Sequence, residues 1–341
     1  MIVDAIRQIV EGESLTRAQA GAVMEEILTG QATPAQFGAF VTALGLKGET
    51  VEEIAGLGET MRRHATRVDL NGLEAVDTCG TGGSGRGWFN VSTTAAFVAA
   101  GAGVPVAKHG NRGVTRPSGS ADVLEALGVR IAVAPEVVAE CVHMAGVGFM
   151  FAQAYHPAMR FAAPLRREIG IRTVFNILGP LSNPAGTRHH LLGVANPTLA
   201  PKMAAALGLI GCTRALVVHG HSGVDEISLT GPTEVIELDR GATTSYRLEP
   251  DRLGLPRDDA SVLRGGAPAE NAAITRGILA AEDRGPRRDV VVANAAGALM
   301  AAGRARDWTD GVAQAAAAID SGAARESLRR LVEITNRGSA P

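Results

Sequence analysis

Apolar residues recur at helical spacing through the first 65 residues of the chain. Three stripes have this spacing: Val23, Met24, Ile27 and Leu28; Phe37, Phe40, Val41 and Leu44; and Ile54, Leu57 and Met61. Residues three and four positions apart share one face of a helix, so each stripe predicts an amphipathic helix with one buried side. Residues 1 to about 65 are therefore predicted to form four short helices.

The ends of these helices carry their own signals. Three helices begin with a threonine that is followed three residues later by Gln or Glu, the pattern of a capping box: Thr16 and Gln19, Thr33 and Gln36, Thr50 and Glu53. Pro34 stands at a first helical position, where its missing N–H costs no hydrogen bond. Gly30 and Gly48 are predicted to end two of the helices.

From about residue 70 the pattern changes to a repeated order of strand, loop and helix. The predicted strands are 75–78, 104–107, 129–133, 147–151, 191–194 and 215–219, with helices at 93–102, 120–127, 136–144 and 199–209. Segments 233–238 and 243–248 predict an antiparallel hairpin at the sheet edge, and the Ala-rich residues 270–336 are predicted to be helical. The predicted fold class is α/β: a small all-helical domain plus a large, mainly parallel α/β domain.

The chain of 341 residues is long enough for two domains, and its 46% apolar content predicts a well-filled core. With 4% aromatic residues and a formal charge of −2, it lacks the stacking residues and basic footprint of a nucleic-acid-binding protein. Cys79, Cys141 and Cys212 are far apart and odd in number, which favours free thiols in a reducing compartment over disulfides or a metal site. Charges throughout residues 1–30 and the lack of a membrane-length apolar run predict a cytoplasmic protein without membrane contact.

A stretch at residues 77–94 holds five glycines between a predicted strand and a predicted helix: Gly80, Gly82, Gly83, Gly85 and Gly87. Glycines allow positive φ and let several backbone N–H groups face one ligand. The following helix adds its free N–H groups and positive dipole end, and hydroxyls follow at Ser92, Thr93 and Thr94. The stretch predicts a phosphate site, because an ordinary tight turn needs only one or two glycines.

Neither standard phosphate fingerprint describes this stretch. Residues 80–85 match the string G-x-G-x-x-G, but the helix is predicted to begin about seven residues later than a dinucleotide-binding fold requires. No Gly-Lys-Ser/Thr follows, which argues against a nucleoside-triphosphatase loop.

A second polar loop, residues 108–120, follows the next predicted strand. Ligands of parallel α/β sheets bind at the carboxyl ends of the strands, so this loop is expected beside the first. It carries three basic side chains and three hydroxyls: Lys108, Arg112, Arg116, Thr115, Ser118 and Ser120. A basic, hydroxylated loop beside a phosphate site predicts a ligand with more than one phosphate group, although Ser120 alone fits a plain helix cap equally well.

Two adjacent carboxylates, Asp225 and Glu226, follow the strand at 215–219. In an extended chain they point to opposite sides, so each could hold a different divalent cation. Carboxylates about 5 Å apart repel by roughly 3 kcal/mol at an effective dielectric near 20, so a pair in a cleft needs a cation. Other acidic pairs, such as Glu282 with Asp283, are interpreted as solvated.

A fourth loop after residue 151 leads into a segment with Arg160, Arg166 and Arg167, then a Gly/Pro/Asn-rich stretch at 172–184. One of these arginines could hold a substrate carboxylate, but spacing does not select which. The chain has no Ser/His/Asp order, Cys/His dyad or zinc cluster, and a lone loop histidine such as His109 is more often a hydrogen-bonding group than a base. No catalytic residue is assigned, and the site is expected to act by positioning and charge stabilisation.

Taken together, these stretches resemble the anthranilate phosphoribosyltransferase family over essentially the whole chain. The matching motifs are Gly80-Thr81-Gly82-Gly83, Phe89-Asn90-Val91-Ser92-Thr93, Lys108-His109-Gly110-Asn111-Arg112, Ser118-Gly119-Ser120, Arg166-Arg167-Glu168, the run from Val174 to Pro184, and Asp225-Glu226. The resemblance implies a small helical domain (1–68, joined by about 172–185) and a large phosphoribosyl-binding domain (69–341) of the nucleoside phosphorylase/phosphoribosyltransferase type. It further implies an active site in the cleft between them and a homodimer formed through the helical domain.

The resemblance also implies substrates, cofactor and site residues. The reaction would be Mg²⁺-dependent transfer of the phosphoribosyl group of 5-phosphoribosyl 1-pyrophosphate to the amine of anthranilate, in tryptophan biosynthesis. The sugar pyrophosphate would bind Gly80, Gly83, Ser84, Asn90, Val91, Ser92, Thr93, Lys108, His109, Gly110, Asn111, Arg112, Gly113, Thr115, Arg116 and Ser120. Anthranilate would bind Gly80, His109, Asn111 and Arg166, and magnesium would bind Ser92, Asp225 and Glu226.

Two positions depart from the family pattern. Ser84 stands where the family generally has Asp, which removes a carboxylate near the metal, and Trp88 stands where it has Ser or Thr. A pyrimidine nucleoside phosphorylase is an alternative, but Gly110-Asn111-Arg112 differs from the Lys-His-Ser run of that loop. A non-catalytic nucleic-acid-binding relative is a second alternative, against which the near-neutral charge and the intact carboxylate pair argue.

Overall fold

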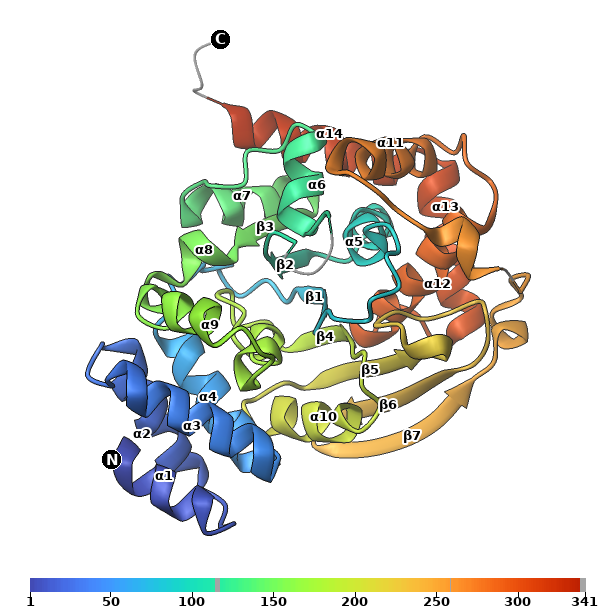
Figure 1. Cartoon of the computed structure of the whole chain (residues 1–341). Helices are drawn as coiled ribbons and strands as arrows, with labels where there is room; N and C mark the ends of the chain where they lie inside the picture. Colours follow the sequence, from blue (N-terminus) through green and yellow to red (C-terminus); the bar gives the residue numbers. More distant parts are fainter. Residues whose placement is uncertain (114–116, 258, 338–341) are drawn as a thin grey trace.

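The computed structural model describes residues 1–113, 117–257 and 259–337 and has a small helical domain beside a large α/β domain (Figure 1). The helical domain begins with α1 (Ile2–Val10), α2 (Arg17–Leu28), α3 (Pro34–Lys47) and α4 (Val51–Arg63), which confirms the four predicted helices. All three capping boxes form, and Pro34 is the first residue of α3. Gly48 caps α3 with φ of 86°, and Gly30 follows the end of α2 with φ of 76°.

The large domain contains one seven-stranded sheet in the order β3-β2-β1-β4-β5-β6-β7. The strands are β1 (Val76–Gly80), β2 (Val106–Gly110), β3 (Val147–Phe151), β4 (His189–Gly193), β5 (Arg214–Gly220), β6 (Thr233–Asp239) and β7 (Ala242–Leu248). The first five pair in parallel, and the predicted hairpin of β6 and β7 forms the antiparallel edge. The predicted fold class is confirmed.

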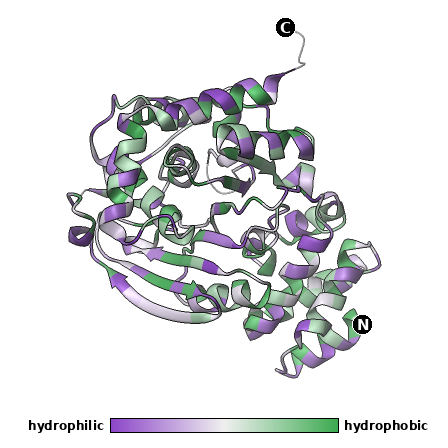
Figure 2. Ribbon diagram, turned by 180° about the vertical axis from the view of Figure 1, so that it is seen from behind, coloured by the Kyte–Doolittle hydropathy of each residue, from purple (hydrophilic) through white to green (hydrophobic). Residues whose placement is uncertain are grey.

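Helices cover both faces of this sheet, and separate apolar clusters lie on the two faces. On one face, Val76, Val106 and Leu191 pack with α5 (Val91–Gly101) and α12 (Pro286–Ala301). On the other, Leu192 and Val217 pack with α10 (Leu199–Leu209), which contacts α4 of the helical domain. Figure 2 shows hydrophobic and hydrophilic residues interspersed along the helices, whereas α12 is buried along nearly its whole length, from Asp289 to Ala301.

Further helices complete the fold, one predicted strand is absent, and the helix predicted to open at His156-Pro157 begins as an α-helix only at Ala163. The helices are α6 (Ser120–Ala126), α7 (Pro135–Ala145), α8 (Ala152–Tyr155), α9 (Ala163–Ile169), α11 (Pro268–Leu279), α13 (Trp308–Asp320) and α14 (Ala323–Asn336). The strand predicted at 129–133 is wrong, because this segment pairs with no strand. Val129 and Ile131 are buried, and the N–H of Arg130 donates to the Thr335 hydroxyl of α14 at 3.3 Å, so a helix supplies the partner that a strand would have supplied.

Residues after β3 return to the helical domain. The ring centroid of Phe175 lies 5.6 Å from that of Phe37 in α3, and Leu178 and Leu181 join the apolar cluster of the four N-terminal helices. These contacts support our proposal that residues 1–68 form the small domain together with about 172–185, and that 69–341 form the large one. Among the described residues, no helix has the length and apolar character needed to cross a membrane.

Candidate active site

Four of the parallel strands end in glycine, and these glycines allow other chain segments to cross the strand ends. A Cβ on Gly80 would lie 2.8 Å from Oδ2 of Asp225, and one on Gly193, the partner of Gly80 in β4, would lie 1.8 Å from the carbonyl oxygen of Asp225. A Cβ on Gly220 would lie 2.3 Å from the carbonyl oxygen of Glu226. Because these glycines have no side chains, Asp225 and Glu226 can lie against the strand ends where the glycine stretch begins.

The end of β2 is crossed in the same way by the start of α6. A Cβ on Gly110 would lie 2.1 Å from the Ser120 hydroxyl, which donates to the carbonyl oxygen of Asn111 at 3.2 Å. The guanidinium of Arg112 pairs with the carboxylates of Asp122 and Glu125 in α6. The predicted phosphate ligand Arg112 is therefore engaged by two acids in this structure, while Ser120 lies at the strand end as expected.

The glycine stretch has the backbone that its sequence predicts. Gly82, Gly83, Gly85 and Gly87 all have φ between 66° and 84°, which L side chains rarely adopt. The helix after it, α5, begins only at residue 91, as the comparison with dinucleotide-binding folds indicated. The stretch is thus a wide loop between the end of β1 and the start of α5.

At the far end of this loop, Asn90 links three parts of the chain. Its Oδ1 accepts hydrogen bonds from the Ser118 hydroxyl at 3.2 Å and from the Asn271 amide at 2.9 Å. Trp88, which departs from the family pattern, is buried in the core of the large domain. Asn90, Ser118 and Asn271 come from three separate segments, and only the first two were singled out from the sequence.

Lys108 is a buried residue of β2, close to the carboxyl end of that strand. Its ammonium donates to the carbonyl oxygen of Thr78, and its side chain is 3% exposed. Burial lowers the pKa of Lys108, and the negative charges of Asp77 and Glu226 oppose that shift. The two negative charges therefore favour the positively charged form of Lys108.

His109 and His156 form a buried pair. Their Nε2 atoms are 3.1 Å apart, and Nδ1 of His109 lies 3.2 Å from the carbonyl oxygen of Gly179. Burial lowers the pKa of His109 to about 3 and that of His156 to about 4, so both rings are neutral near pH 7. Since Nδ1–H of His109 donates to Gly179, its Nε2 accepts from His156, and His109 is a hydrogen-bonding group with both nitrogens engaged.

This pair predicts how stability depends on pH. Below pH 6.5 the unfolded chain protonates these rings, whereas folded His156 stays neutral down to about pH 4, so stability falls as pH falls through this window. His156→Gln is expected to reduce the slope of the unfolding free energy between pH 6.5 and 4 by up to about 1.4 kcal/mol per pH unit. Urea unfolding at several pH values measures this slope. The exposed His143→Gln is the control, and parallel curves for His156→Gln and the parent would contradict the assignment.

Two arginines border the region between the domains. The guanidinium carbon of Arg166 lies 5.3 Å from the centroid of the Phe175 ring, and partial burial lowers the pKa of this side chain. Arg172 lies against the glycine loop, since a Cβ on Gly83 would lie 1.6 Å from its Nη1. Arg172 was not singled out from the sequence, although it opens the Gly/Pro/Asn-rich segment that was.

A cavity of about 320 Å³ lies between the helical domain and the strand ends. Gly45 and Glu49 line it from the helical domain, Thr81 and Gly83 line it from the large domain, and Arg172 lines it from the segment that returns to the helical domain. Its further lining residues are Thr173, Asn176, Ile177, Ala195, Asn196 and Leu199. The cavity adjoins the glycine loop and combines backbone amides, a guanidinium and side-chain amides, a set that suits an anionic polar ligand.

The structure therefore brings together most of the predicted site residues. The strand ends, the loops beside them and the first turns of α5 and α6 contain Gly80, Gly83, Ser84, Asn90, Val91, Ser92, Thr93, Lys108, His109, Gly110, Asn111, Ser120, Asp225 and Glu226. Gly113 donates its N–H to Asp122 at 2.8 Å, next to the outward-turned Arg112. Arg166 lies at the helical-domain side, and Thr115 and Arg116 are outside the described residues.

Comparison with known proteins gives one consistent result. Residues 3–65 match a family model described as "Glycosyl transferase family, helical bundle domain", and residues 72–325 match "Glycosyl transferase family, a/b domain". The anthranilate phosphoribosyltransferase of Anaeromyxobacter sp. (strain K) is 56% identical over 335 residues, which cover 98% of this chain and 99% of that protein.

Solved structures agree with the sequence relatives. The crystal structure of anthranilate phosphoribosyltransferase from Thermus thermophilus superposes with a TM-score of 0.93 at 43% identity, over 98% of this chain and 99% of that one. The enzyme from Saccharomyces cerevisiae in complex with PRPP and Mg has a TM-score of 0.89 at 29% identity, over 98% of each chain. The two alternatives, a nucleoside phosphorylase and a nucleic-acid-binding relative, find no support in these relatives.

Proposed function

This chain belongs to the anthranilate phosphoribosyltransferase family, and from this premise we propose that the strand-end loops described above are its active site. The enzyme transfers the phosphoribosyl group of 5-phosphoribosyl 1-pyrophosphate to the amine of anthranilate and releases pyrophosphate. The bond between C1 of the ribose and the pyrophosphate oxygen breaks, a bond from C1 to the amine nitrogen forms, and the amine gives up one proton.

The observation that carries the site proposal is the approach of Asp225 to two strand-end glycines. Gly80 and Gly193 leave room for the Asp225 carboxylate and backbone directly beside the glycine loop, where a phosphorylated ligand would lie. Backbone N–H groups of that loop and of the start of α5 would hold the phosphates. Lys108, whose protonated form is favoured by the charges of Asp77 and Glu226, would add positive charge at the same edge.

The residues beside Gly80 fit magnesium. Carboxylates of Asp225 and Glu226 and the hydroxyl of Ser92 form an all-oxygen donor set, which is the set that Mg²⁺ prefers, and a Cβ at Gly80 would fill the space beside Oδ2 of Asp225. When bound, magnesium neutralises charge on the departing pyrophosphate. We assign the cation to these three residues.

The site needs no general base. The aromatic amine of anthranilate is unprotonated at neutral pH and can attack C1 directly. His109, which the family resemblance links to anthranilate, is neutral, and both of its nitrogens are engaged by His156 and Gly179, so it serves to shape the pocket. Arg166, held over the Phe175 ring, is our proposed partner of the anthranilate carboxylate.

The activity is tested by the loss of anthranilate fluorescence when phosphoribosyl pyrophosphate and Mg²⁺ are added to the purified protein. Calorimetric titration with phosphoribosyl pyrophosphate, with and without Mg²⁺, separates binding from turnover. We expect consumption only when all three components are present. Consumption that continues after Mg²⁺ is removed by a chelator would contradict the proposed use of the carboxylate pair.

We propose that two copies associate through the helical domain. Val10 of α1 and Leu46 of α3 are 71% and 85% exposed, unusual for large apolar side chains, and α1 lies at the outer end of the molecule (Figure 1).

Val10→Lys with Leu46→Lys is expected to convert a dimer to a monomer in sedimentation velocity. Met144→Lys with Val262→Lys alters exposed apolar residues of the large domain and should leave the dimer intact; dissociation by that pair instead would overturn the proposed interface.

The reaction and the free thiols support two further proposals, on pathway and on location. We propose that the reaction serves tryptophan biosynthesis. Cys79, Cys141 and Cys212 are all free thiols, which supports the predicted reducing compartment, the cytoplasm.

A further inference from the structure

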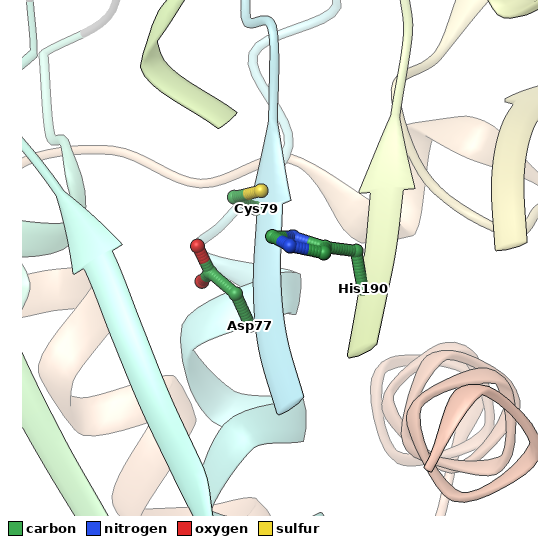
Figure 3. A group of neighbouring side chains, drawn as sticks. All are labelled: Asp77, Cys79 and His190. Atoms are coloured by element: carbon green, nitrogen blue, oxygen red, sulfur yellow. The ribbon is translucent and has the colours of Figure 1, made fainter. Parts of the chain in front are cut away.

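Three side chains with metal-binding atoms gather on the face of the sheet that lies away from the Asp225 carboxylate. Asp77 and Cys79 alternate with Thr78 in β1 and so share one face, and His190 is the registered partner of Asp77 in β4. One ligand atom from each of the three lies within 4.8 Å of the others. Figure 3 shows the His190 ring reaching from β4 across β1 toward Asp77 and Cys79.

His190 presents a nitrogen whose hydrogen-bonding capacity is unused. Its Nε2 lies 3.0 Å from the carbonyl oxygen of Thr187 and 3.3 Å from the Thr187 hydroxyl, so Nε2–H donates there. Its Nδ1 is buried and has no partner among the described residues, and the side chain is 3% exposed. Histidines that bind metals commonly donate their second nitrogen to a backbone carbonyl in this way, which leaves the first as a lone-pair donor.

The carboxylate of Asp77 is held in place by neighbours. Oδ1 accepts the backbone N–H of His109 at 3.2 Å, and Oδ2 accepts the side-chain amide of Asn183 at 2.8 Å. Asp77 is fully buried, so these two donors replace water as its hydrogen-bond partners and fix its orientation. A carboxylate fixed by such outer contacts is a preorganised metal ligand.

Cys79 supplies the third donor and narrows the choice of metal. Burial together with the Asp77 charge raises the pKa of the thiol. A set of one sulfur, one nitrogen and one oxygen suits Zn²⁺ and other soft or borderline divalent ions, whereas Mg²⁺ takes oxygen ligands alone.

We propose that Asp77, Cys79 and His190 form a site for one zinc-type divalent cation, separate from the magnesium site at Asp225 and Glu226. Ligand atoms of a tetrahedral zinc ion lie about 3.5 Å apart, given bonds of about 2.0–2.3 Å, so the three side chains close by about 1 Å around it. Binding displaces the thiol proton to solvent and leaves a fourth coordination position for water. The ion links β1 to β4 directly before Gly80, and so stiffens the strand end from which the glycine loop starts.

The test uses Co²⁺, whose thiolate complexes are coloured, on the full chain after removal of metals with a chelator. We expect one equivalent of Co²⁺ to produce a sulfur-to-cobalt charge-transfer band with visible bands of tetrahedral coordination, and one equivalent of Zn²⁺ to bleach them. Cys79→Ser and His190→Gln should each lower the affinity for Co²⁺ by more than about 100-fold. Zinc should also raise the melting temperature of the parent but of neither variant.

Two controls keep the outcome decisive. Cys212→Ser, at another buried thiol, and the variant with Asp225→Asn and Glu226→Gln should both retain the cobalt spectrum. Zinc X-ray absorption of the parent covers the case in which Cys79→Ser fails to fold, and should give one sulfur at about 2.3 Å with nitrogen and oxygen at about 2.0 Å. The proposal is wrong if the parent binds no Co²⁺ with sulfur ligation, or if the spectrum is lost with Cys212 instead of Cys79.

Discussion

Replacing Asp225 with asparagine and Glu226 with glutamine in one protein is expected to lower kcat by about a thousandfold, which corresponds to roughly 4 kcal/mol of lost transition-state stabilisation. The reason is that both residues lie at glycine-ended strands beside the glycine loop, where we propose that pyrophosphate charge develops. The amides keep the size of the side chains and remove their charge. The measurement is anthranilate consumption against Mg²⁺ concentration.

The matched control is Glu282→Gln with Asp283→Asn, which makes the same change of charge at a loop between α11 and α12. That pair is expected to leave kcat within about twofold of the parent, as is usual for substitutions outside a site. Near-normal turnover by the Asp225 and Glu226 variant would remove these two residues from the magnesium site.

Arg166→Ala is expected to raise the KM for anthranilate by about 10- to 100-fold, since a hydrogen-bonded charge contact contributes about 1.5–3 kcal/mol. Partial burial over the Phe175 ring leaves the guanidinium short of water, which strengthens its attraction for a carboxylate. The KM for phosphoribosyl pyrophosphate should change little, because Arg166 lies at the helical-domain side of the site.

Arg167→Ala provides the comparison for this prediction. Arg167 is the next residue of α9 and is exposed, so its removal changes the net charge equally without touching the proposed pocket. A rise in the anthranilate KM of the same size in both variants would point to a general charge effect, and an unchanged KM in Arg166→Ala would exclude this residue from the pocket.

The sequence predicted those parts of the fold that depend on neighbouring residues. Thr16, Thr33 and Thr50 cap their helices because the partner side chain is only three residues away. The strand predicted at 129–133 is wrong for the opposite reason. Its apolar residues are buried, as Val129 shows, but the N–H of Arg130 donates to the hydroxyl of Thr335, which is 205 residues further along the chain. The local pattern of apolar residues predicts which side chains are buried, but it does not predict which element accepts the backbone hydrogen bonds.

The same distinction holds for the site. The glycine stretch and the Asp225-Glu226 pair were recognisable because several residues of one chemistry stand together, and the glycines have the positive φ that this predicted. Arg172 was not singled out as a ligand, because an isolated arginine carries no pattern of its own; only the fold sets it against Gly83.

The sequence by itself determined the capped starts of the N-terminal helices, most of the order of strand and helix, the glycine-rich loop and the family. Only the tertiary structure decided that His109 is neutral and hydrogen-bonded to His156, and that Asp77, Cys79 and His190 meet on one face of β1 and β4. The physical reason is distance along the chain. Caps and turns are set by atoms a few residues apart, whereas Asp77 and His190 become neighbours, and lose their water, only when strands more than a hundred residues apart pair in register.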